Sequence, residues 1–291
     1  MTKELNDVPL QQLELPQGNI AYRYSDIGAE ETFIFIHGWI DNMQSFSGLA
    51  PYFLDKFNCL FFDLPGHGFS HTATSREAYH FTSYISRLHD IILQLKIDKI
   101  RFIGHSFGAA IALCFASAFP EKIIDLSLIE GIAPIGEDEN LAPQRLRDSV
   151  LAHSRKKKEH RHFETIEQAI ALRQTASDLS FEEAQTLVKG QIKETAKGWQ
   201  WTYDRRLKMP SPTRLSNTQI CAYIAAVQAP VKLILGHWGY FLEDSEGEDI
   251  KPKPLTEEYL SHFKNIDVDV IDGHHHLHLT SPEIVAEIIF E

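Results

Sequence analysis

Short apolar runs of strand length alternate with amphipathic segments along most of this 291-residue chain. Segment 79–95, for example, carries apolar side chains at helical spacing from Phe81 to Leu95. Such alternation is typical of βαβ units, whose strands lie parallel in one sheet. The expected strands span 19–27, 32–38, 58–68, 99–104, 122–131, 229–237 and 266–272, and the expected helices 45–54, 79–95, 107–119, 256–264 and 281–290. The pattern predicts an α/β fold with a mostly parallel sheet.

The strand pattern is interrupted between residues 135 and 229. Helical segments take its place, at 142–153, 165–176, 180–196 and 216–228. Ser180 and Glu183 have the spacing of a capping box at the start of one of these segments. We therefore predict a core formed by residues 1–134 and 230–291, with a helical cap at 135–229 inserted into it.

Charge and cysteine content exclude several classes of protein. A net charge of −12 argues against a general affinity for nucleic acid or anionic membranes. The three cysteines are widely spaced, form no metal-ligand pattern and suit a reducing compartment. The first residues lack the apolar core of a secretory signal, and no apolar run approaches the ~18 residues of a membrane span. We expect a soluble cytoplasmic protein that needs no metal and no cofactor and binds neither nucleic acid nor membranes.

A serine stands between two glycines where a predicted strand meets a predicted helix, in the segment 104–108 with the sequence Gly-His-Ser-Phe-Gly. Glycine permits close approach of two backbones and unusual backbone angles. The pattern is that of the nucleophile elbow, in which a strained turn exposes the serine hydroxyl beside free backbone N–H groups. An N-cap serine in a glycine-rich turn is the alternative. A nucleophilic Ser106 would need a histidine base and an acid that orients it.

Five segments together carry a resemblance to a known family: FIHGW at 35–39, DLPGHGFS at 63–70, GHSFGA at 104–109, WTYDRRL at 201–207 and GHHHLHLTSPE at 273–283. In this order they resemble the α/β-hydrolases, and the chain is similar to the serine hydrolase-like branch of that fold. The resemblance implies an eight-stranded, mostly parallel sheet with helices on both faces. It also implies a triad in the chain order serine, acid, histidine.

The histidine-rich loop offers several candidates for the base. Family members commonly carry a catalytic histidine seven residues before a proline, and Pro282 then points to His275. His274 stands where a glycine is more usual and is the alternative. His276 is a flanking position. A metal site would require convergent geometry that a contiguous run of histidines does not guarantee.

The acid departs from the common family pattern. Most α/β-hydrolases place an aspartate three residues after a strand-end glycine, but that position here is Gly239. Glu130 ends the strand after the elbow helix, and the run resembles that of haloalkane dehalogenases and their luciferase relatives, some of which hold a glutamate acid there. A carboxylate at the end of an apolar strand needs a partner if it is buried, and a histidine would supply one. Glu130 is the expected acid, with Glu243 or Asp244 as alternatives.

Two backbone N–H groups are expected to form an oxyanion hole, namely those of Trp39 and Phe107. Candidate pocket residues are His37, Trp39, His105, Trp199 and Trp201. His37 and Asp63 are expected to brace loops, and anchoring of the cap is the alternative role of its two tryptophans.

The combined pattern predicts a serine esterase that cleaves small-molecule carboxylic esters through an acyl-enzyme, as a monomer or homodimer. Serine-triad cleavage of lactones, amides or carbon–carbon bonds is an alternative. A non-catalytic binding protein of the same fold is another, because fold alone does not determine function. Dehalogenases and epoxide hydrolases use an aspartate nucleophile, so Ser106 disfavours them.

Overall fold

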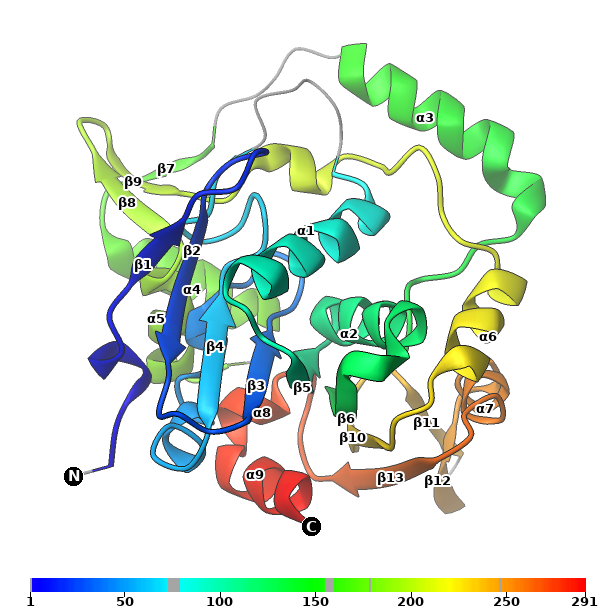
Figure 1. The fold of residues 1–291 in the computed structure, drawn as a ribbon. Helices are drawn as coiled ribbons and strands as arrows, with labels where there is room; N and C mark the ends of the chain where they lie inside the picture. Colours follow the sequence, from blue (N-terminus) through cyan, green and yellow to red (C-terminus); the bar gives the residue numbers. More distant parts are fainter. Residues whose placement is uncertain (1, 73–78, 155–159, 178, 246–247) are drawn as a thin grey trace.

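The computed structural model describes residues 2–72, 79–154, 160–177, 179–245 and 248–291. Its centre is an eight-stranded sheet in the order β1-β2-β4-β3-β5-β6-β10-β13 (Figure 1). The strands are β1 Gln11–Leu13, β2 Ile20–Ser25, β3 Glu31–Ile36, β4 Asn58–Phe62, β5 Lys99–His105, β6 Ile123–Ile129, β10 Val231–Gly236 and β13 Ile266–Ile271. β2 pairs antiparallel with β1 and with β4, and the other neighbours are parallel. The predicted α/β-hydrolase architecture is therefore confirmed, and β1 is a strand that the sequence analysis did not predict.

The central strands of the sheet are buried on both faces, because their alternate side chains belong to two different apolar clusters. In β3, Ile34 and Ile36 pack in the cluster formed with helices α1 Phe81–Gln94, α2 Phe107–Ala118 and α6 Asn217–Ala226. Phe33 and Phe35 pack in the cluster formed with α9 Pro282–Phe290 and the 3₁₀ helices η2 Met43–Phe46 and η3 Ala50–Tyr52. Because these strands are parallel, their carboxyl ends lie at one edge of the sheet, and the loops that follow them gather there.

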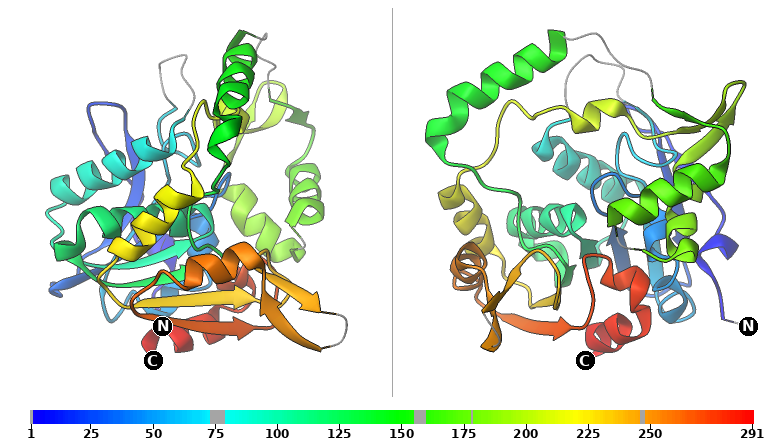
Figure 2. Two further views of the ribbon diagram at one scale, coloured as in Figure 1. Left: turned by 90° about the vertical axis from the view of Figure 1, so that its right-hand side faces the viewer. Right: turned by 180° about the vertical axis from the view of Figure 1, so that it is seen from behind.

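The inserted region is not purely helical, which corrects the sequence prediction. It contains α3 Ala142–Ser154, α4 Ile166–Ser177 and α5 Phe181–Lys189, and also an antiparallel three-stranded sheet in the order β7-β9-β8. Those strands are β7 His162–Phe163, β8 Ile192–Thr195 and β9 Gly198–Trp201. Figure 2 shows α3 standing away from the rest of the molecule. The last predicted helix of the insertion, α6, packs instead against the core cluster through Ile220 and Ile224.

Two predicted helices are shorter than expected. The predicted helix 180–196 has its capping box at Ser180 and Glu183, as expected, but ends at Gly190, and β8 follows. The predicted helix 45–54 is divided into η2 and η3, because Pro51 near the start of η3 has no N–H to continue a helical ladder. At the last helix, Ser281 is the N-cap residue, but its side chain makes no capping hydrogen bond.

A β-hairpin that the sequence analysis did not predict follows β10. It consists of β11 Leu242–Ser245 and β12 Glu248–Pro252, and α7 Pro254–Leu260 comes next. A short helix, α8 Leu277–Thr280, separates the histidine-rich loop from α9. The remaining 3₁₀ helices are η1 Leu5–Asp7, η4 Pro120–Lys122, η5 Glu139–Leu141 and η6 Arg205–Lys208. Among the described residues, no helix has the length and apolar character needed to cross a bilayer.

Candidate active site

Ser106 occupies a strained turn between β5 and α2. Its φ of 51° and ψ of −112° lie outside the regions that most residues adopt. Gly104 and Gly108, two residues to either side of Ser106, let neighbouring backbones approach this turn closely. A Cβ on Gly108 would lie 1.9 Å from the carbonyl oxygen of Ile36, and one on Gly104 would lie 2.7 Å from the Cα of Ala109. The backbone therefore has the features of a nucleophile elbow, with the serine at the N-terminus of the helix.

Glu130 and His275 meet although 145 residues separate them in the sequence. Glu130 follows β6 with a φ of 46° and is buried, and its Oε2 lies 3.1 Å from His275 Nδ1. The same carboxylate accepts hydrogen bonds from the N–H of Gly236 at 2.7 Å and of Tyr240 at 3.2 Å. These donors compensate the carboxylate for the water it loses on burial. The acid and base expected from the sequence are thus in contact.

Gly239 lies against the carboxylate of Glu130. A Cβ on Gly239 would lie 2.1 Å from Glu130 Oε1, much closer than any real contact. A side chain at residue 239 and the carboxylate of Glu130 therefore compete for the same space. The alternative acid Glu243 is exposed in β11, and the side chain of Asp244 lies outside the described residues.

The loop of His275 is attached to the elbow by the residue before Ser106. His105 Nε2 lies 2.8 Å from the carbonyl oxygen of His275, so the ring donates this hydrogen bond. The part of the chain that the structure describes contains no hydrogen bond between Ser106 and His275 side chains. In unliganded enzymes such bonds are often long and shorten only with substrate.

The N–H groups of Trp39 and Phe107 have no hydrogen-bond partner among the described residues. Phe107 is the first residue of α2, where helical N–H groups are free. The two aromatic rings contact each other, with centroids 4.9 Å apart, so the loop after β3 and the start of α2 lie side by side. Two free donors at this place can stabilise negative charge on a substrate oxygen.

The comparisons with known proteins agree with this fold. A sequence profile for the alpha/beta hydrolase fold matches residues 31–151. Serine hydrolase-like protein from Danio rerio is 26% identical over 266 residues, which cover 87% of this chain and 78% of that protein. Serine hydrolase-like protein 2 from Homo sapiens is 25% identical over 296 residues, covering 96% and 91%. A hypothetical protein from Pseudomonas aeruginosa has a crystal structure that matches with a TM-score of 0.85 and 27% identity, covering 97% of this chain and 98% of that one. The chain has the fold of the α/β-hydrolase superfamily.

Within this superfamily the similarity is to the serine hydrolase-like branch. The thioesterase domain from the curacin biosynthetic pathway has a TM-score of 0.84 at 21% identity and shares the fold. Together the relatives support a hydrolase.

In this α/β-hydrolase fold, His37 and Asp63 brace the loops around the site. His37 Nε2 accepts a hydrogen bond from the N–H of Leu64 at 2.9 Å, and Nδ1 donates to the carbonyl oxygen of Gly38 at 2.8 Å. Burial lowers the pKa of His37 to about 4, so the ring is neutral. Asp63 accepts hydrogen bonds from two backbone N–H groups, both at 2.8 Å.

The five predicted pocket residues differ in exposure and packing. His37 and His105 are 0% and 1% exposed, and their hydrogen bonds support the loops around the site. Contact of either residue with a substrate stays a prediction. Trp199 and Trp201 pack on the apolar cluster of the cap itself. Trp39 is 38% exposed beside the elbow. Contact between these three tryptophans and a substrate stays a prediction.

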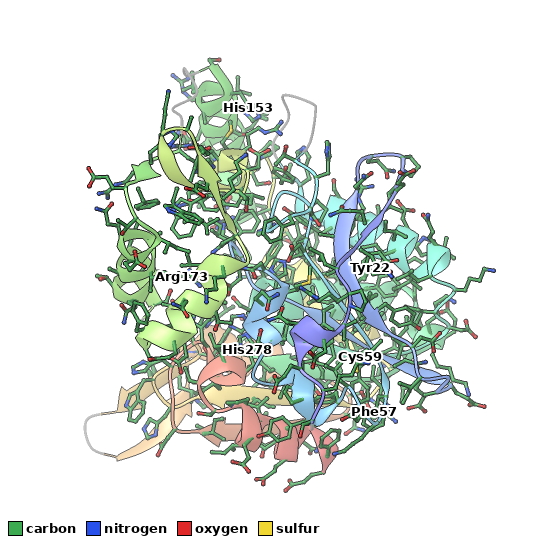
Figure 3. The ribbon with its side chains drawn as sticks, turned by 90° about the vertical axis from the view of Figure 1, so that its left-hand side faces the viewer. Tyr22, Phe57, Cys59, His153, Arg173 and His278 are labelled. Atoms are coloured by element: carbon green, nitrogen blue, oxygen red, sulfur yellow. The ribbon has the colours of Figure 1, made fainter. Side chains whose placement is uncertain are left out.

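Sequence reasoning missed two features of the candidate site. Tyr240, which is 66% exposed, has its ring 4.4 Å from that of His275. Arg173 of α4 donates to buried Asp41 at 3.1 Å, and Asp41 also lies 3.4 Å from Nε2 of His276. Figure 3 shows Arg173 on the cap and His278 on α8. No sequence signal pointed to Tyr240 or to Arg173, because each contact joins segments that are far apart in the chain.

Proposed function

We propose that this protein is a serine esterase that cleaves carboxylic esters through an acyl-enzyme. The observation that carries the proposal is the 3.1 Å contact between Glu130 Oε2 and His275 Nδ1, on a loop hydrogen-bonded to the residue before Ser106. A histidine held in this way has one tautomer, with its proton on Nδ1 and its lone pair on Nε2.

In the first half-reaction Ser106 Oγ attacks the ester carbonyl carbon while His275 Nε2 takes the hydroxyl proton. The carbonyl oxygen becomes an oxyanion between the N–H groups of Trp39 and Phe107. Glu130 stabilises the imidazolium that forms. When the tetrahedral intermediate collapses, the ester C–O bond breaks and His275 gives its proton to the leaving alcohol.

In the second half-reaction water takes the place of the alcohol. His275 removes one proton from the water as its oxygen attacks the acyl carbon. The bond to Ser106 Oγ then breaks, and the serine regains its proton from His275. The products are the free enzyme and a carboxylic acid.

Small and medium acyl groups are the expected substrates, because a cap with its own apolar cluster covers the sheet domain beside the loops of the site. Turnover is measured for a series of p-nitrophenyl esters of graded acyl length and for emulsified long-chain triglyceride. Faster turnover of the triglyceride than of the C2–C6 esters would contradict this. We further propose a cytoplasmic location, since all three cysteines are free, and a monomer or homodimer.

Ser106→Ala tests the proposal directly. Turnover of p-nitrophenyl acetate should fall by about 10³–10⁶, as for other triads, with an unchanged unfolding temperature. A fluorophosphonate probe should label the native protein at Ser106 and leave the variant unlabelled. Substantial activity in the variant would exclude Ser106 as nucleophile. A native protein without labelling would favour a non-catalytic binding protein, and labelling without ester turnover would favour amide, lactone or carbon–carbon bond cleavage.

A further inference from the structure

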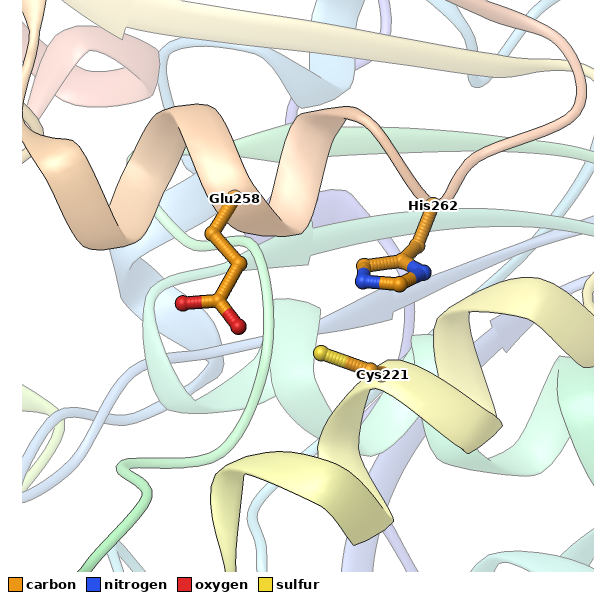
Figure 4. Close-up of side chains that lie close together, drawn as sticks. All are labelled: Cys221, Glu258 and His262. Carbon is orange, nitrogen blue, oxygen red and sulfur yellow. The ribbon is translucent and has the colours of Figure 1, made fainter.

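A cluster of three possible metal ligands lies away from the candidate active site, between α6 and α7. Figure 4 shows the side chains of Cys221, Glu258 and His262 converging from these two segments. One ligand atom from each residue, a sulfur, a carboxylate oxygen and an imidazole nitrogen, lies within 4.8 Å of the other two. In the described part of the chain, no other side chain hydrogen-bonds to the donor atoms of Glu258 or His262.

The helices that carry the cluster are held together by neighbouring residues. Tyr259, next to Glu258, is buried, and its hydroxyl lies 3.0 Å from Oδ1 of Asn217, one helical turn before Cys221. Glu258 lies in α7, and His262 lies in the turn that follows the end of α7 at Leu260. The backbone positions of all three ligands are therefore set before any ion binds, which reduces the entropy lost on binding.

The donor set suits zinc better than magnesium or calcium. Zn²⁺ accepts thiolate, imidazole and carboxylate ligands together, whereas the two harder cations require oxygen. Tetrahedral Zn²⁺ ligands are about 3.5 Å apart, so small side-chain rotations would bring these three into range. A water molecule would complete the four ligands.

We propose that Cys221, Glu258 and His262 form a zinc-binding site that joins α6 to α7. Binding replaces the thiol proton of Cys221 with the metal and releases that proton to the solvent. The site is independent of the proposed esterase chemistry and holds no reacting group of it.

Protection of Cys221 from alkylation tests the site with Zn²⁺ itself as the probe. Cys221 is partly buried, whereas Cys59 and Cys114 are buried, so iodoacetamide should modify Cys221 first in the native protein. Zn²⁺ at about 100 times its dissociation constant should slow that modification at least tenfold, as followed by peptide mass spectrometry, and should raise the unfolding temperature by roughly 5 °C. The folded native protein is used throughout.

Matched variants separate this site from zinc bound to exposed histidines elsewhere. His262→Gln and Glu258→Gln should abolish protection of Cys221, whereas Glu257→Gln, an exposed neighbour on the same helix, should keep it. Equilibrium dialysis should show one zinc equivalent fewer in Cys221→Ser than in the native protein. Native protein without zinc protection, or protection that persists in both His262→Gln and Glu258→Gln, overturns the proposal. Ester turnover serves as a folding control and should be unchanged in Cys221→Ser.

Discussion

At the scale of single residues, the carboxylate of Glu130 is the group on which the candidate site most depends. Glu130→Gln would keep the shape but lose the charge that stabilises a protonated His275, so turnover should fall by about 10³–10⁴. Steady-state kinetics with a p-nitrophenyl ester measures this. Glu243→Gln is the matched control, since Glu243 is exposed in β11. Loss of turnover in the control but not in Glu130→Gln would transfer the role of acid to Glu243.

A second prediction at this scale concerns the space that a side chain at residue 239 would share with the carboxylate of Glu130. Gly239→Asp alone should be damaging, because its Cβ would lie 2.1 Å from Glu130 Oε1. Combined with Glu130→Gly, which removes the clash and suits the φ of 46° at position 130, the new aspartate has room. We expect the double variant to be at least tenfold more active than Glu130→Gly, in line with the size of a triad acid's contribution. Equal activities would show that an acid cannot act from position 239.

At the scale of elements, one ion-pair network connects the cap to the core. Arg173 of α4 reaches Asp41 in the loop after β3, and Asp41 in turn contacts His276, the neighbour of His275. Arg173 and His276 hold the pKa of Asp41 well below its usual range in spite of its burial. The network therefore links the position of α4 to that of the histidine-rich loop.

Arg173→Met should leave the buried Asp41 charge without its main partner. We expect the free energy of unfolding to fall by about 3 kcal/mol, as for other broken buried pairs. Adding Asp41→Asn removes the stranded charge and should restore part of the loss, whereas Arg147→Met on exposed α3 should change little. Urea denaturation is measured for the native protein, the two single variants Arg173→Met and Asp41→Asn, the double variant and the Arg147→Met control. Additive effects of the two substitutions would show that the pair is not coupled.

At the scale of the whole molecule, buried neutral histidines make stability depend on pH. Burial lowers the pKa of His37 to about 4. Burial, with a smaller contribution from repulsion by a protonated His37, lowers the pKa of His67 to about 3. An unfolded histidine has a pKa of about 6.5, so below that value the unfolded chain binds protons that the folded chain does not. Both residues therefore destabilise the fold as the pH falls from about 6.5 towards 4.

His67→Gln should weaken this dependence. Each such histidine contributes a slope of about 1.4 kcal/mol per pH unit, and the variant should lose one such contribution. Urea denaturation at a series of pH values from 7 to 4.5 measures the slope. His80→Gln, at a partly buried surface position, is the comparison. An unchanged slope in His67→Gln would show that this ring does not couple folding to acid.

Local interactions explain why much of the molecule can be predicted from its residues in order. Apolar periodicity predicts the strands of the parallel sheet. The glycines around Ser106 predict a close approach of two backbones, and the structure shows it between Gly108 and Ile36 of β3. Where a proline or glycine competes with a helical pattern, as at Pro51 and Gly190, the periodicity alone misleads.

Contacts between distant segments, by contrast, were decided by the tertiary structure. Sequence and family resemblance left Glu130, Glu243 and Asp244 open as the acid, and only the packing of β6 beside β10 brings Glu130 to His275 and fills the space at Gly239. The Arg173–Asp41 ion pair, the sheet in the cap and the Cys221 cluster likewise join residues far apart in the chain. Periodicity and spacing record which residues are apolar and how close they are in sequence. They do not indicate which buried charges come into contact, because those contacts depend on the packing of the whole fold.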